Sequence, residues 1–153
     1  MRPSRGPLPL TALVLSVLSA CAGSQDAADD PGGDFARATE RLQALEIVED
    51  VEAMRRDDVP TDAQGQTVSP TEAVLVRVAG LPCPEQSVDC GAVLERFPSE
   101  ADAQRRADFV IAFRSGTPGL GAGRIVRDGP LLLRLSDQLP RATEQALEEE
   151  LTD

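Results

Sequence analysis

The residues of this chain whose types and spacing suit a specific chemistry are its three cysteines, Cys21, Cys83 and Cys90. Only six residues separate Cys83 from Cys90. In an exported chain this spacing favours a local disulfide. A redox-active pair and a metal-binding pair are the alternatives, although the spacing is not Cys-x-x-Cys and the chain has no histidine. We therefore predict a Cys83–Cys90 disulfide, which leaves Cys21 for another role.

Cys21 ends an apolar segment with the layout of a secretory signal. Met1–Arg5 is basic, and Pro7–Ala20 carries no charge and is too short to span a bilayer as a helix. The stretch Leu18-Ser19-Ala20-Cys21 resembles the lipobox of bacterial lipoproteins. The resemblance implies that residues 1–20 are a signal peptide and that Cys21 becomes an acylated N-terminus. Two or three acyl chains, such as palmitate, anchor a protein stably. We expect the membrane to be its partner, at the extracytoplasmic face of a cell membrane or outer membrane.

Four arginines form the second candidate set, because they alternate with apolar residues on segments that read as strands: Arg77, Arg124, Arg127 and Arg134. An exposed sheet face that carries several guanidinium groups would bind a carboxylated ligand or partner through bidentate contacts. Ordinary polar-outward alternation, with each arginine paired to one of the many acids, is the interpretation that we favour. The four remain candidate ligand-facing residues.

The missing residue types exclude several chemistries. The chain has no His, Lys, Tyr or Trp, and all 15 of its basic residues are Arg. Catalysis by a Ser-His-Asp or Cys-His system, a Schiff-base lysine and a phosphate-loop lysine are therefore excluded. The acidic pairs do not follow a calcium-loop pattern, so we predict no metal and no cofactor. The acids that remain available, among them Glu95, Asp102 and Asp108, read as charges on solvated faces.

The charge balance also restricts the partners. The whole chain has a net charge of −11, and two of the 15 arginines precede Cys21, so the part from Cys21 onward has 13 Arg against 26 acids, or −13. Such a surface repels nucleic acid and anionic lipid headgroups. We expect no nucleic-acid partner.

The elements that must position these residues follow from composition and periodicity. Residues 21–33 are small and acidic and read as a flexible tether. Residues 34–56 begin with apolar residues at helical spacing and predict an N-terminal helix. Residues 57–70 contain Pro and Gly and predict a loop. The organised domain is then expected to be 71–153.

Within residues 71–153 the patterns predict strands and helices in turn. Val74, Val76 and Val78 alternate as in a half-buried strand. A second strand is expected over 92–97, a helix over 99–113 with an S-x-x-D start, a hairpin over 124–135 around Asp-Gly, and a helix over 140–151. This order predicts an α+β fold: a small two-layer sandwich in which two or three helices cover one face of an antiparallel sheet of about four strands.

The body from Val93 onward also resembles two kinds of envelope protein. A strand ending in Phe97-Pro-Ser99, a helix with Glu100-Ala-Asp-Ala103 and a hairpin before a last helix are similar to the sporulation-related peptidoglycan-binding repeat. The ending LLLRLSDQLPRATEQALEEEL resembles small actinobacterial lipoproteins of unknown function. We therefore expect a lipid-anchored, non-enzymatic binding module at the cell envelope, with an envelope protein or the cell wall as partner. The alternatives are a peptidoglycan-binding module and an envelope enzyme that uses carboxylates and Arg.

Overall fold

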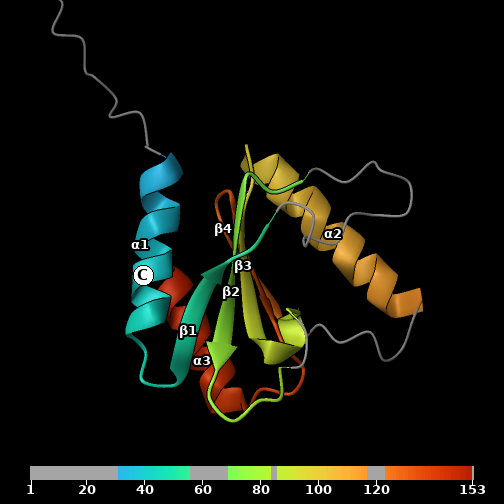
Figure 1. Ribbon diagram of the computed structural model, residues 1–153. Helices are drawn as coiled ribbons and strands as arrows, with labels where there is room; N and C mark the ends of the chain where they lie inside the picture. Colours follow the sequence, from blue (N-terminus) through green and yellow to red (C-terminus); the bar gives the residue numbers. More distant parts are fainter. Residues whose placement is uncertain (1–30, 56–68, 84–85, 117–122, 153) are drawn as a thin grey trace, which may run out of the picture.

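The computed structural model of the protein describes four stretches of the chain, residues 31–55, 69–83, 86–116 and 123–152 (Figure 1). The expected signal peptide, Cys21 and most of the expected tether lie outside the described residues. So do residues 57–68 of the expected loop and residues 117–122 before the hairpin.

The centre of the domain is a five-stranded antiparallel sheet in the order β1-β2-β3-β5-β4. The strands are β1 (Val48–Ala53), β2 (Glu72–Val78), β3 (Gly91–Arg96), β4 (Ile125–Asp128) and β5 (Leu131–Leu135). The helices are α1 (Pro31–Ala44), α2 (Glu100–Gly116) and α3 (Arg141–Thr152), and a short 3-10 turn, η2 (Val88–Cys90), precedes β3. The predicted α+β class with an antiparallel sheet is confirmed, with one strand more than expected.

The additional strand corrects the prediction of a single helix over 34–56. The helix α1 ends at Ala44, and Val48–Ala53 forms the edge strand β1 beside β2. The apolar residues near Val48 continue the helical spacing by coincidence, whereas their β-branched side chains suit a strand that has a neighbour to pair with. The helix also begins earlier than expected, at Pro31, because proline is favoured in the first turn of a helix.

Two helices cover one face of the sheet, and the third lies on the other (Figure 1). The main core joins Leu42 of α1 and Leu147 of α3 to sheet residues such as Val76, Leu94 and Leu133. The helix α2 instead packs Ala103 and Ala107 on Leu132 and Phe97, which belong to a separate cluster. The expectation that the helices share one face therefore holds for α1 and α3 only.

Local signals place the remaining turns. The Ser99 hydroxyl accepts a hydrogen bond from the Asp102 amide at 3.2 Å, as the predicted cap of α2 requires. The hairpin forms as expected, but its loop is shifted by one residue, because Asp128 pairs with Leu131 across the ladder. Gly129, with φ of 50°, takes the left-handed position of the turn, which glycine adopts without steric cost.

Candidate functional site

The four candidate arginines do not converge on one site. Three of them, Arg77, Arg127 and Arg134, lie on the sheet face that α2 partly covers, because they occupy register positions of the same parity as Leu75 and Leu132. Each of the four binds a different glutamate: Arg77 to Glu52 at 3.0 Å, Arg124 to Glu148 at 2.8 Å, Arg127 to Glu100 at 3.7 Å and Arg134 to Glu95 at 3.2 Å. Ligand binding by these arginines stays a prediction.

The most buried of these pairs belongs to a three-residue group that we call the buried charge cluster, Glu95, Arg106 and Arg134. Glu95 is fully buried, Arg106 is 3% exposed and Arg134 is 7% exposed. Arg134 donates from Nε and Nη2 to the two carboxylate oxygens of Glu95 at 3.2 Å each, and Arg106 Nη2 donates to Glu95 Oε1 at 3.3 Å. Two cations therefore share one anion between the sheet and α2.

The electrostatics of the cluster follow from this burial. Desolvation lowers the pKa of Arg134 from its ordinary value, Glu95 opposes the shift, and the nearby Arg106 adds to it. Arg106 Nε is buried and makes no hydrogen bond. Its guanidinium carbon lies 5.9 Å from the centre of the Phe109 ring, at the limit of a cation–π contact. The three side chains thus form a buried ion cluster that links α2 to β3 and β5.

The interpretation of Glu95 as a charge on a solvated face is therefore wrong. The signal that was missed is the pattern around it, because Val93 and Phe97 lie on the same side of the strand and are both apolar. With Ala92 and Leu94 apolar on the other side, the strand reads as buried on both faces. Arg106 likewise stands one turn from Ala103 and Val110 on the buried side of α2.

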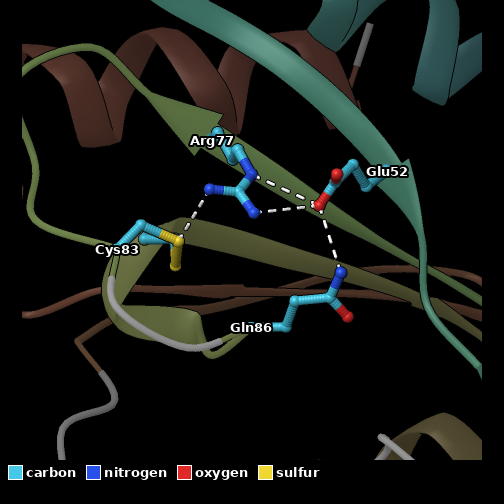
Figure 2. A network of polar contacts seen from close by, with 5 residues as sticks. Glu52, Arg77, Cys83 and Gln86 are labelled. Carbon is cyan, nitrogen blue, oxygen red and sulfur yellow. Dashed lines mark hydrogen bonds and ion pairs between the residues drawn. A yellow bond between two sulfur atoms is a disulfide. The ribbon is translucent and has the colours of Figure 1, made fainter.

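A second polar group surrounds the disulfide, which is present between Cys83 and Cys90 as predicted, with the two Cα atoms 4.7 Å apart. Figure 2 shows Arg77 between Glu52 and Cys83. Arg77 donates from Nε and Nη2 to Glu52 Oε2 at 3.3 and 3.0 Å and from Nη1 to Cys83 Sγ at 3.1 Å. Gln86 donates to the same Glu52 oxygen at 3.2 Å. We call these residues, with Cys90, the disulfide network.

The disulfide network borders an open recess of about 430 Å³, lined by Glu52, Ala53, Arg55 and Gln86. Its lining is mostly polar and the recess is open to solvent. The pockets that hold small organic ligands are instead enclosed and largely apolar. Within the residues that the structure describes, no three His, Cys, Asp or Glu side chains gather as a metal-binding set.

The third feature is apolar and lies at the end of α2. Ile111 and Phe113 are each 51% exposed, and Ala112 between them is also exposed. The Phe113 ring stacks on Phe109 with their centres 5.9 Å apart. We call these four residues the apolar end of α2. In Figure 1 this part of the helix extends beyond the sheet. Phe109 and Phe113 are four positions apart, which places them one helical turn apart on the same side of α2.

None of the described helices is both long enough and apolar enough to cross a membrane. Comparison of the chain with protein families, with curated proteins and with solved structures finds no match.

Proposed function

We propose that this protein is a lipid-anchored, non-enzymatic binding module that holds a protein partner at the extracytoplasmic face of the cell envelope. The anchor rests on the lipobox-like Leu18–Cys21 stretch, which precedes the described residues. A binding role accords with the residue types, since the chain offers no His or Lys for catalysis. The described arginines on the sheet pair with glutamates instead of facing an enclosed cavity.

The observation that best supports a protein partner is the exposure of the apolar end of α2. Two large apolar side chains, Ile111 and Phe113, are about half exposed to solvent, and Phe113 is aromatic. Aromatic residues in such positions contribute strongly to protein–protein contacts. The net charge of −11 makes a partner with basic residues around an apolar recess the complementary surface, and it disfavours an anionic lipid surface.

The anchor is tested by fractionation of cells that express the protein with Cys21→Ser. The unmodified chain is expected in the membrane fraction and the variant in the soluble extracytoplasmic fraction. Persistent membrane association of the variant would contradict the anchor without bearing on the binding surface.

The binding surface is tested by placing a photo-crosslinking amino acid at Ala112 in the native cell. The expected result is a discrete protein adduct that is lost when Phe113→Asp is added and retained with the control Asp108→Asn, which changes an exposed residue of the same helix. The same crosslinker at Gln145, exposed on α3, should give no such adduct. An adduct that survives Phe113→Asp refutes the proposed surface. Retention of the purified protein on isolated cell wall, independent of Phe113, would favour the peptidoglycan-binding alternative instead.

A further inference from the structure

The two cysteines of the disulfide differ in their exposure to solvent. Cys90 is 1% exposed and packs on Leu75 of β2 and Val93 of β3, whereas Cys83 is only partly buried. Thiol–disulfide exchange requires a thiolate to reach one of the two sulfur atoms directly. Of the two cysteines, only Cys83 keeps appreciable solvent-exposed surface, so we take it as the residue that an external thiol approaches.

A positive charge stands at the accessible sulfur. The Arg77 guanidinium donates from Nη1 to Cys83 Sγ at 3.1 Å (Figure 2). An adjacent arginine favours the thiolate form of a cysteine and attracts an incoming thiolate. Glu52 weakens this effect, because its carboxylate binds the same guanidinium and offsets part of its charge. The pairing leaves Arg77 29% exposed and fixed in direction toward the disulfide.

We propose that Cys83–Cys90 is an exchange-competent disulfide rather than an inert brace. Cys83 is the sulfur that forms mixed disulfides with exported thiols, and Arg77 is the positioning residue that stabilises the Cys83 thiolate. The inference goes beyond the proposed binding role and does not depend on the apolar end of α2.

The reaction balances with an external thiol, either a small thiol or a dithiol protein of the envelope, as the reductant. Its thiolate attacks Cys83 Sγ, a new S–S bond forms, and the Cys83–Cys90 bond breaks. Cys90 leaves as a thiolate and takes a proton from water. A second thiol then attacks the external sulfur of the mixed disulfide and releases Cys83 as a thiolate beside Arg77. Two external thiols are thereby oxidised to one disulfide, while Cys83–Cys90 is reduced to two thiols.

The first experiment locates the reacting sulfur. The oxidised full-length protein is exposed to limiting glutathione, free thiols are alkylated after quenching, and the modified peptide is fragmented by mass spectrometry. The expected intermediate carries glutathione on Cys83 and the alkyl group on Cys90. Glutathione on Cys90, or no intermediate under conditions that reduce an unstructured peptide of the same sequence, overturns the proposal.

The second experiment separates electrostatics from simple loosening of the structure. The equilibrium between the disulfide and the dithiol is titrated with glutathione for Arg77→Gln, Arg77→Lys and Glu52→Gln. Arg77→Gln is expected to shift the equilibrium about tenfold toward the disulfide, which is about 30 mV for a two-electron couple. Glu52→Gln should shift it in the opposite direction, because it keeps a hydrogen-bond acceptor but removes the negative charge. Arg77→Lys should restore most of the wild-type equilibrium.

The signs of the shifts in Arg77→Gln and Glu52→Gln distinguish an electrostatic role of Arg77 from a purely structural one. Both substitutions break the same ion pair, so a purely structural role of Arg77 predicts that they move the equilibrium in the same direction. That result, or no shift with either variant, overturns the role of Arg77. Circular dichroism of each oxidised variant provides the check that the domain remains folded.

Discussion

Arg134 and Glu95 lie diagonally across neighbouring strands of the sheet and form a bidentate ion pair that is almost wholly buried. Both hydrogen bonds measure 3.2 Å, and Glu95 on β3 is fully shielded from solvent. The third member of the buried charge cluster, Arg106, comes from α2 and leaves the group with one cation more than it has anions. The cluster thus ties α2 to the sheet beside the apolar contact of Ala107 with Leu132.

Removing the only anion of the cluster should be strongly destabilising. In Glu95→Gln, two buried guanidinium groups lose their counter-charge, so the free energy of unfolding is expected to fall by about 3–5 kcal/mol. The control Glu72→Gln removes the exposed partner of Arg96 and should cost less than about 1 kcal/mol. Urea denaturation of both variants measures the difference. Equal losses would mean that the buried pair contributes no more than a surface pair.

The two arginines of the cluster should not be equivalent. Arg106→Met leaves the bidentate Arg134–Glu95 pair intact, removes the excess charge and eliminates a buried Nε without a hydrogen bond. Its cost is expected to be below about 1 kcal/mol, because replacing a poorly satisfied buried charge with an apolar group is often neutral. Arg134→Met removes both hydrogen bonds of the bidentate pair and should cost at least about 2 kcal/mol. Chemical denaturation that ranks them in the reverse order would contradict the assignment of Arg134 as the principal partner.

Two phenylalanines of the chain differ in surroundings and should differ in their contributions to stability. Phe97 is fully buried between β3 and α2, and Phe97→Ala is expected to lower the free energy of unfolding by about 3–5 kcal/mol. Phe113 is 51% exposed, so Phe113→Ala should change it by less than about 1 kcal/mol. Thermal unfolding of the two variants under the same conditions checks this. A large loss for Phe113→Ala would show that its ring serves folding and not only contact with a partner.

Gly91, where β3 begins, should tolerate no side chain. Its φ is 148°, and an added Cβ would lie 2.5 Å from the carbonyl oxygen of Val76 on the neighbouring strand. We expect Gly91→Ala to cost more than about 2 kcal/mol, since backbone strain and displacement of a neighbouring strand combine. Gly129→Ala is the matched control, because its φ of 50° is strained but its surroundings are open, and its cost should be about 1 kcal/mol. Urea titration measures the free energy of unfolding of both variants. Similar losses would contradict the close approach of Gly91 to the Val76 carbonyl.

Reduction of the disulfide should destabilise the domain without unfolding it at room temperature. Cross-linking residues seven positions apart closes a loop of about 8 residues, for which the chain-entropy model gives about 2.5 kcal/mol. The double substitution Cys83→Ser with Cys90→Ser should lose a similar amount relative to the oxidised protein. Denaturant curves of both forms, with and without reductant, provide the measurement. An unchanged midpoint on reduction would mean that the loop contributes no constraint.

Much of the fold was predictable because its signals are local. The alternation of Val74, Val76 and Val78 predicted β2, and the glycine of the hairpin turn marked the connection between β4 and β5. The strand β1 was missed because Val48 and Val51 suit a helical spacing as well as a strand, and only the pairing with β2 decides between the two. Pairing depends on residues about 25 positions away, which no local pattern contains.

The candidate sites divide in the same way. The spacing of Cys83 and Cys90 was enough to predict their disulfide. A separation of seven positions keeps the two cysteines close in space whatever the rest of the fold. By itself the sequence therefore determined the local elements and this cross-link. Only the tertiary structure decided that α2 covers the second face of the sheet, that Arg77 points at Cys83, and that Glu95 lies between two arginines. These relations arise from strand register and helix packing, which bring together residues that are distant in the sequence.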